Sequence, residues 1–216
     1  MELWRRAGVV LPLAAGAVAL PLATGALATP ASPTYVRIVG NQSSRDGAVP
    51  ELIVIHATTD PRSSSGPVFR DRPGIRDLRR LGRWFDNPRS AVSSHVANDA
   101  DGNDARYVRD GRRAWTEVAF NPVSLSIEQI GSVDFSRATW MRRRPQLKDT
   151  ARWIAHWHRK WGIPIRPAQV SGTSVITPGV ATHAQLGAAG GGHRDPGSDY
   201  PLTYVLGLAR SLAARR

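Results

Sequence analysis

The sequence predicts an α/β fold, in which a single domain has a central mixed β-sheet flanked by α-helices. Short apolar runs rich in β-branched residues alternate with longer segments whose apolar residues recur at helical spacing. The chain of 216 residues is long enough for one domain with a sizeable core, and it has no cysteine, so no disulfide stabilises it. We therefore expect one layered domain.

Residues 1–28 are predicted to be a signal peptide, which makes the protein secreted or held in the cell wall. Arg5 and Arg6 precede an apolar run over residues 7–23, and residues 26–28 are Ala-Leu-Ala, the small-x-small form of a signal peptidase site. An uncleaved membrane anchor is the alternative interpretation. Two prolines within the run and the Ala-x-Ala ending favour cleavage after Ala28.

A segment with the composition of a linker leads into the domain. Residues 29–47 are rich in Pro, Ser, Gly and Asn, and one short strand is expected at residues 35–39. The run Leu-Ile-Val-Ile-His opens a predicted buried strand over residues 52–57, because it is short and rich in β-branched residues. A polar loop with three consecutive serines follows over residues 58–67.

Three further strands are expected in the middle of the chain. Two of them, at residues 93–98 and 106–109, flank an Asp- and Asn-rich turn at residues 99–104. The start of this turn resembles a calcium loop, but its sixth position is Asp104 and not glycine, so a hairpin turn with Asx caps is favoured. The third strand, at residues 124–130, carries a glutamate.

Three helices complete the predicted fold. The first covers residues 74–86 and ends near an Asn-Pro pair, the second ends at Gly162 ahead of a proline, and the third covers residues 204–213. The second helix also carries tryptophans every four residues, a spacing that suits a core or a groove. Its apolar stripe consists of Leu147, Ala151, Ile154, His158 and Trp161.

The chain is strongly basic, with 29 Lys and Arg against 17 Asp and Glu and a formal net charge of +12. A basic exported protein is attracted to polyanions, so anionic wall polymers and phospholipid headgroups are expected partners. The simpler interpretation is that the charge keeps the protein soluble. Nucleic acid is less expected, because no aromatic RNA-binding signature and no helix-turn-helix pattern accompanies the charge.

Five residues that can bind metal or transfer protons lie at predicted strand ends or in Gly-rich loops. Two histidines and an aspartate could hold Zn²⁺, which in catalytic sites takes three protein ligands and leaves a fourth position open. Their spacing fits no compact metal motif, so residue types alone give only modest support. The five residues are His56, Glu128, His183, His193 and Asp195.

Four segments in order resemble the N-acetylmuramoyl-L-alanine amidase type 2 family. They are Ile-Val-Ile-His-Ala-Thr, Ser-Ser-His-Val-Ala-Asn-Asp-Ala-Asp-Gly, Ala-Trp followed by Ser-Leu-Ser-Ile-Glu-Gln-Ile-Gly, and Thr-His-Ala-Gln-Leu-Gly followed by Gly-His-Arg-Asp-Pro-Gly. The resemblance covers roughly residues 48–212. It implies the zinc amidase fold that peptidoglycan recognition proteins and phage lysozyme-like amidases share.

The resemblance also implies roles for single residues. The family's zinc ligands match His56, His183 and Asp195, and its general base for the attacking water matches Glu128. Where the family commonly has an oxyanion-stabilising lysine, this chain has His193. A histidine with a pKa of about 6.5 is only partly protonated at neutral pH, so an added pH dependence is expected.

Other positions depart from the family pattern or have structural interpretations. Thr116 follows Trp115, where many relatives have histidine, which puts sugar or peptide binding near this tryptophan in doubt. Ser94 stands where some phage relatives have a catalytic tyrosine, and it is left without a role. His95 is expected to be structural or to support a ligand from behind.

The function that the resemblance implies is zinc-dependent hydrolysis of peptidoglycan, at the amide between N-acetylmuramic acid and L-alanine. A peptidoglycan-binding protein of the same fold without hydrolysis is the main alternative. Such binders typically lack a zinc ligand, whereas all three candidates are present here, which favours an enzyme. A zinc peptidase or another wall amidase that cuts a different bond is the second alternative.

Overall fold

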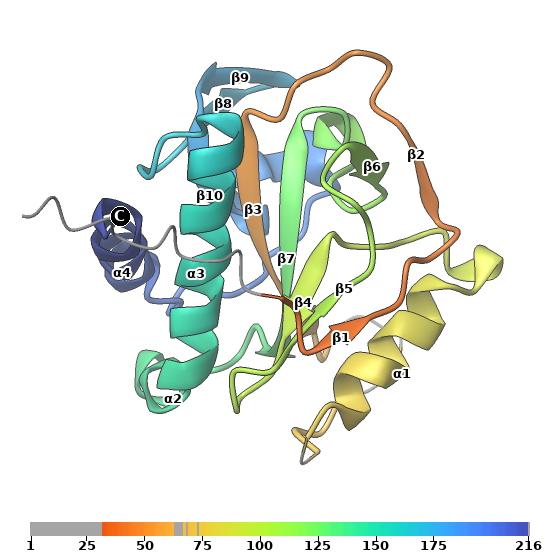
Figure 1. Ribbon diagram of the computed structural model, residues 1–216, viewed down its shortest axis with the longest axis vertical. Helices are drawn as coiled ribbons and strands as arrows, with labels where there is room; N and C mark the ends of the chain where they lie inside the picture. The colour runs from red at the N-terminus through yellow and green to blue at the C-terminus, as the bar shows by residue number, and fades with distance from the viewer. Residues whose placement is uncertain (1–31, 63–66, 68, 73, 216) are drawn as a thin grey trace, which may run out of the picture.

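The computed structural model describes residues 32–62, 67, 69–72 and 74–215, and its centre is a six-stranded sheet (Figure 1). Its strands are β1 (Tyr35–Val36), β3 (Leu52–Thr59), β4 (Val96–Asn98), β5 (Asp104–Arg106), β7 (Ser124–Ser132) and β10 (Gly179–Thr182). Their order is β1-β5-β4-β7-β3-β10, and every neighbouring pair is parallel except β4 with β5. The predicted mixed sheet is confirmed.

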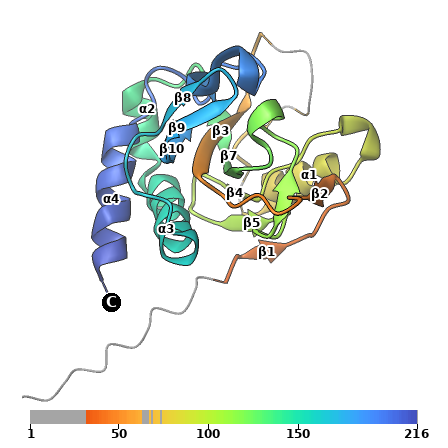
Figure 2. The same cartoon turned by 90° about the horizontal axis from the view of Figure 1, so that it is seen from above.

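Helices cover both faces of the sheet, as Figure 2 shows from above. The helices α2 (Arg137–Arg142), α3 (Arg144–Trp161) and α4 (Leu202–Ala214) lie on one side, and α1 (Arg76–Phe85) lies on the other. Ile53 and Ile55 of β3 belong to the apolar core under α3 and α4, whereas Leu52 and Val54 pack in a cluster with Phe120. Alternate residues of one strand therefore build two cores, as the pleat requires.

The same alternation divides β7 into an apolar face and a polar face. Leu125 and Ile127 join the core under α3. Ser124, Ser126 and Glu128 lie on the opposite face, because successive side chains of a strand point to opposite sides. This polar row faces away from the three-helix layer and supplies side chains to the candidate site.

The hairpin between β4 and β5 confirms the expected Asx turn. Asp99 accepts hydrogen bonds at Oδ1 from the backbone N–H groups of Asp101 (3.1 Å) and Asn103 (2.9 Å). The first strand is shorter than expected, and the prediction of the second at residues 106–109 is wrong, because β5 starts two residues earlier and ends at Arg106. The amides of Tyr107 and Val108 both donate to the carbonyl of His95, so the ladder is irregular there and regular pairing ends.

The helices agree closely with the predicted ones. Helix α1 is amphipathic and has Leu78, Leu81 and Phe85 buried in a cluster with Ala97 of β4. Helix α3 ends at Trp161, and Gly162 follows with φ of 73°, a left-handed conformation that suits glycine. Pro145 stands in the first turn of α3, where a missing N–H costs nothing.

The short strand expected in the linker is present as β1, which ends at Val36 and pairs with β5. Several other elements were not anticipated from the sequence, among them β2 (Gln42–Ser44) in the expected linker and its partner β6 (Arg112–Ala114). The residues predicted as a signal peptide lie outside the described residues. The remaining unanticipated elements are α2, β8 (Gln169–Ser171), β9 (Ser174–Thr177), β10, and the 3-10 helices η1 (Pro88–Ser90), η2 (Val118–Phe120) and η3 (His183–Gly190).

None of the helices within the described part of the chain combines the length and the apolar character needed to cross a membrane.

Candidate active site and metal centre

Strand register brings three of the five predicted site residues together. His56 of β3 is paired with Glu128 of β7, and Ile55 of β3 is paired with Thr182, the last residue of β10. His183 follows Thr182 directly, so it stands beside His56, with the two ring centroids 4.3 Å apart. Because the three strands are parallel, their carboxyl ends meet at one edge of the sheet, where α/β proteins place their sites.

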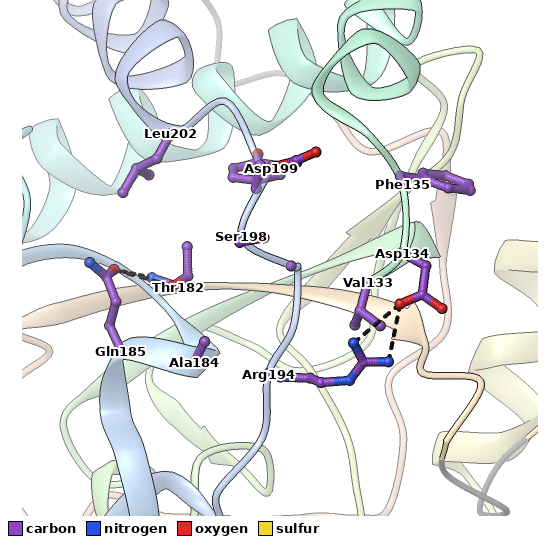
Figure 3. A pocket seen from close by; sticks show the side chains of 12 residues that line it. Val133, Asp134, Phe135, Thr182, Ala184, Gln185, Arg194, Ser198, Asp199 and Leu202 are labelled. Atoms are coloured by element: carbon purple, nitrogen blue, oxygen red, sulfur yellow. Dashed lines mark hydrogen bonds and ion pairs between the residues drawn. The ribbon is translucent and has the colours of Figure 1, made fainter.

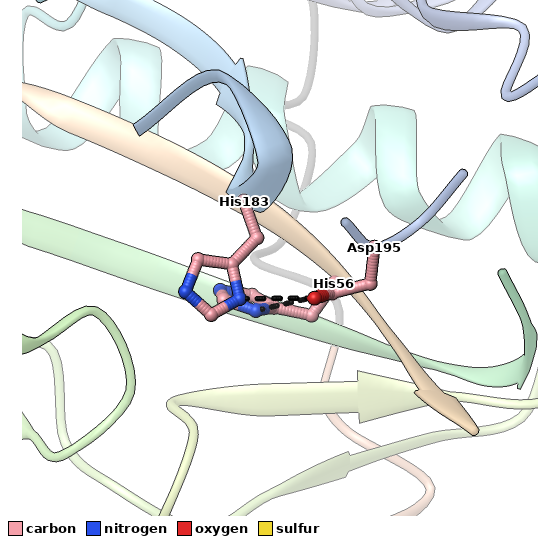
Figure 4. A group of neighbouring side chains, drawn as sticks. All are labelled: His56, His183 and Asp195. Carbon is pink, nitrogen blue, oxygen red and sulfur yellow. Dashed lines mark hydrogen bonds and ion pairs between the residues drawn. The ribbon is translucent and has the colours of Figure 1, made fainter. Parts of the chain in front are cut away.

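Asp195 comes to this edge from the loop before α4, and Figure 4 shows both imidazoles in contact with its carboxylate. Its Oδ2 lies 3.2 Å from Nδ1 of His56, and its Oδ1 lies 3.1 Å from Nδ1 of His183. One possible ligand atom from each residue lies within 4.8 Å of the others, and all three residues are buried. Positions that are far apart in the sequence thus form one compact group.

The loop that carries Asp195 is held on both sides. The guanidinium of Arg194 donates to Asp60 at 2.7 and 2.8 Å and to Asp134 at 3.1 Å, the latter contact being visible in Figure 3. Arg194 and Asp134 also line a cavity of about 700 Å³. Gly197 passes so close to the carbonyl oxygen of Val133 that a Cβ there would lie 2.1 Å from it, so only glycine fits.

A glutamate that the sequence analysis missed is also part of the site. Oε1 of Glu117 lies 3.0 Å from Nε2 of His56, and its Oε2 accepts a hydrogen bond of 2.6 Å from the hydroxyl of Ser124. Its side chain is fully buried. A signal was available, since the chain has only four glutamates and this one lies two residues after Trp115, in a segment that carries the family resemblance.

Both nitrogens of His56 and of His183 face atoms that can only accept hydrogen bonds. His183 has Nδ1 against Asp195 and Nε2 at 2.7 Å from the carbonyl oxygen of Gly190. His56 has Nδ1 against Asp195 and Nε2 against Glu117. A neutral imidazole has one N–H, which can donate to one acceptor, while the lone pair of its other nitrogen faces the second acceptor unfavourably. A positive centre is therefore needed where both Nδ1 atoms meet the Asp195 carboxylate.

This donor set fits zinc. Two imidazole nitrogens and one carboxylate oxygen match the three protein ligands of catalytic zinc sites. Tetrahedral ligands at 2.0–2.1 Å from an ion lie about 3.3 Å from one another, close to the 3.1 and 3.2 Å between Asp195 and the histidine nitrogens. The Nε2–H groups find acceptors in Glu117 and Gly190, the outer contacts that fix ligand tautomers in metal sites.

Burial and neighbouring charges shift the pKa values of the residues at this site. Burial raises the pKa of Asp195, but hydrogen bonds from His183 and His56 outweigh it and hold this pKa far below its usual range. Burial lowers the pKa of His56, and its contacts with Asp195 and Glu117 reverse this and raise it. Burial raises the pKa of Glu128 to about 8, with His56 opposing and Asp195 adding to the rise. The surroundings of the histidines are thus rich in acidic groups and favour a cation.

A groove of about 190 Å³ runs over these residues. His193 lines it with a side chain that is 59% exposed, and its ring stacks on that of His183 with centroids 4.4 Å apart. Burial, followed by the proximity of His183, lowers the pKa of His193. Glu128 also lines the groove. All five predicted site residues therefore line one groove.

The remaining candidates divide between the groove and the interior. Trp115 and Thr116 line the groove, and the indole N–H of Trp115 donates to the hydroxyl of Ser43 at 3.0 Å. Ser94 is buried away from the groove, where its hydroxyl donates to the carbonyls of Val96 and Ser126. His95 is also buried, and it contacts Ser126 and Arg45 among others, in agreement with a structural role.

Comparison with known proteins identifies relatives of this arrangement. The profile of the family described as N-acetylmuramoyl-L-alanine amidase matches residues 46–198. Among solved structures, the hydrolase AmiA of Staphylococcus aureus in complex with its ligand superposes with a TM-score of 0.59 at 17% identity, over 86% of this chain and 89% of that one. A selenomethionine derivative of AmpD gives 0.55 at 19% identity, over 82% and 93%.

A mutant of PlyL gives a TM-score of 0.54 at 16% identity, over 82% of this chain and 98% of that one. At these identities the three structures establish a shared fold. The search of curated proteins returned no match.

Proposed function

The chain belongs to the N-acetylmuramoyl-L-alanine amidase family, whose members act on cell-wall peptidoglycan, and from this premise we propose that it is a zinc-dependent amidase. The bond that it cuts is the amide between the lactyl group of N-acetylmuramic acid and the L-alanine of the stem peptide. The observation that carries the zinc dependence is the convergence of two Nδ1 atoms on the Asp195 carboxylate, with each Nε2 directed at another acceptor.

His56, His183 and Asp195 would hold the ion. A zinc ion at this position supplies a Lewis acid that polarises the scissile carbonyl and makes the attacking water more acidic. The three residues line the groove, so the carbonyl of a substrate bound there can reach them. Asp195 also accepts a bond from the amide of Ala57 at 3.3 Å, which keeps its carboxylate turned toward the histidines.

Glu128 is proposed as the general base and acid. Its carboxylate lines the groove in register with His56, so it can take a proton from water as the new C–O bond forms. The same proton passes to the alanine nitrogen when the C–N bond breaks, which yields a lactyl carboxylate and a free amine. His193 borders the same space, and we assign it a hydrogen bond from its imidazole to the carbonyl oxygen as negative charge develops there.

The walls of the groove support a substrate with apolar faces and amide groups. Phe69, Trp84 and Trp115 contribute aromatic surface to it. Aromatic rings pack against the apolar faces of sugars and peptides, while the indole N–H of Trp115 is held by Ser43. This lining supports muramyl-peptide binding near Trp115 even though Thr116 replaces the more usual histidine.

We further propose that residues 1–28 direct export and that the mature enzyme acts in the wall, where anionic polymers are additional partners. Helix α1 supports the second part. Arg76, Arg79, Arg80 and Arg83 recur at the spacing of one helical stripe, on the side away from the buried Leu78 and Leu81. Such a stripe can attract a polyphosphate backbone next to the groove, which residues of the same helix also line.

One sample can test metal and bond together. Purified protein is analysed for zinc by elemental analysis and then incubated with peptidoglycan, and the soluble products are identified by mass spectrometry. We expect about one zinc per chain and free stem peptides that begin with L-alanine. The Asp195→Ala variant should lose both zinc and products.

Other outcomes would assign a different function to the protein. Zinc-containing protein that releases products cut within the stem peptide would make it a peptidase. Retention of peptidoglycan without any product would make it a binding protein. A chain that releases stem peptides without zinc, and with unchanged rate in Asp195→Ala, would refute the assignment of the metal site.

A further inference from the structure

Glu117 is a buried carboxylate that the proposed reaction does not use. Its side chain is fully buried, and removing an ionised carboxylate from water costs several kcal/mol unless partners compensate. The structure supplies these partners: His56 Nε2 at 3.0 Å from Oε1 and the Ser124 hydroxyl at 2.6 Å from Oε2. Both carboxylate oxygens are therefore engaged, and neither is directed at the substrate groove, whose lining does not include Glu117.

The backbone around Glu117 is fixed as well. The side-chain oxygen of Asn121 accepts from the amides of Thr116 at 2.9 Å and of Glu117 at 2.6 Å. Ser124, the hydroxyl donor, is the first residue of β7 and is paired in register with Leu52 of β3. Glu117 is thus held by the strand next to the one that carries His56, in a segment with little freedom to move.

The imidazole of His56 lies between two carboxylates, with Glu117 in contact with its Nε2 and Asp195 in contact with its Nδ1. An ionised carboxylate only accepts hydrogen bonds, so its contact with Nε2 requires the ring proton at Nε2. The lone pair of a neutral imidazole is then on Nδ1, which faces Asp195. His183 reaches the same tautomer through the neutral carbonyl of Gly190, at 2.7 Å from Nε2.

We propose that Glu117 is a positioning residue that sets the tautomer and orientation of His56 and makes its Nδ1 a stronger zinc ligand. The inference rests on the proposed zinc dependence. Carboxylates that accept from a ligand histidine raise its basicity, and their loss typically costs 10–100-fold in metal affinity. Ser124 would strengthen the same effect indirectly, because its hydroxyl donates to the Glu117 carboxylate and so keeps that carboxylate against the His56 ring.

The test measures zinc affinity of the full-length protein after its metal has been removed, by competition with a chromophoric chelator. We expect zinc to bind ~10–100-fold more weakly to Glu117→Ala, with a smaller loss in Glu117→Gln, whose amide oxygen can still accept from Nε2. Ser124→Ala should lose less than either. Glu51→Gln, which removes the same charge from an exposed position before β3, should bind zinc as the wild type does.

A second readout reports on the ring itself. Nitrogen-15 NMR of histidine-labelled protein distinguishes a proton on Nε2 from one on Nδ1. In the zinc-loaded wild type, His56 should show the Nε2–H signature, and Glu117→Ala should shift this resonance because its acceptor is gone. A merely structural contribution of Glu117 would lower the thermal midpoint without changing either the tautomer signal or the affinity.

The outcomes separate the two proposals. If the wild type does not bind zinc, the proposed metal site is wrong, whatever the variants do. If the wild type binds zinc and both Glu117 variants bind it equally tightly, the positioning role is refuted. Should Glu117→Ala fail to fold, Glu117→Gln and Ser124→Ala decide the question, because each removes a single polar feature and keeps the packing nearly unchanged.

Discussion

Glu117 and Glu128 are the same residue type in one site, and their surroundings shift their pKa values in opposite directions. Burial raises the pKa of both. At Glu117 the hydrogen bonds from His56 and Ser124 outweigh burial and bring the pKa below its usual value. At Glu128 the described residues supply no such bond, and burial raises the pKa to about 8. A fixed anion behind the ligand and a group that can exchange a proton in the groove are the two roles that follow.

The proton-transfer role of Glu128 predicts a specific kinetic defect. Glu128→Gln should lower kcat by ~10²–10⁴, because the amide cannot accept the proton of the attacking water. Zinc content should stay at the wild-type level, since Glu128 is not one of the three proposed ligands. The measurement is the rate of stem-peptide release together with elemental analysis, with Glu51→Gln as the control for charge. Turnover near the wild-type rate would exclude Glu128 as the base.

At the scale of elements, helix α1 has two functional sides. Its buried side packs on β4 and β5, and Leu81, Trp84 and Phe85 reach the groove. Its other side carries the arginine stripe, in which Arg79 lies over the ring of Tyr35 at 5.7 Å. The same 3.6-residue period thus produces an apolar contact with the site and a cationic surface beside it.

The stripe predicts binding of a polyanion that depends on this helix. Changing Arg76, Arg80 and Arg83 together to glutamine should weaken the binding of poly(glycerol phosphate) several-fold at low salt, and the difference should shrink as salt rises. The matched control replaces Arg142, Arg144 and Lys148, exposed on the three-helix side, with glutamine. Binding is followed by fluorescence anisotropy. Equal losses in the two triple variants would show that net charge, and not this surface, attracts the polymer.

At the scale of the whole molecule, the buried His95 connects β6 and the segment between β2 and β3 to the central sheet. His95 Nδ1 lies 2.9 Å from the hydroxyl of Ser126 in β7, and its Nε2 lies 3.0 Å from the carbonyl of Arg112 in β6. Arg45, from the segment between β2 and β3, reaches the same ring at 3.0 Å. Burial and the nearby Arg45 charge lower the pKa of His95 to about 4.

This shift predicts how stability depends on pH. An unfolded histidine has a pKa of about 6.5, so between pH 6.5 and about 4 the unfolded chain binds a proton that the folded chain does not. Neutral His95 therefore contributes up to about 3 kcal/mol to the free energy of unfolding. This contribution is fully present above pH 6.5 and is lost as the pH falls toward 4. His95→Asn should flatten this dependence in urea titrations at pH 7, 6 and 5, whereas His158→Asn on α3 should keep it. An unchanged slope in His95→Asn would assign the acid sensitivity to other groups.

The sequence determined the local patterns of this fold. The run at residues 52–57 contains four apolar residues before His56, which suffices to predict a buried strand that ends in a polar site. Helix α3 was predicted with its end at Gly162. Its apolar stripe and the glycine shortly before a proline are local signals, which a sequence shows directly. Residue type and the order of four family segments also predicted five site residues, and all five line the groove.

Tertiary structure decided which groups meet and what each then does. Strand β10 has only four residues and follows a proline, so its pairing with β3, which brings His183 to His56, came from contacts remote in sequence. Glu117 became part of the site only because β7 and the loop before it return alongside β3. Hydrogen bonds, burial and the choice of histidine tautomer depend on distances between such segments, and those distances are fixed by packing of the whole chain rather than by any local pattern.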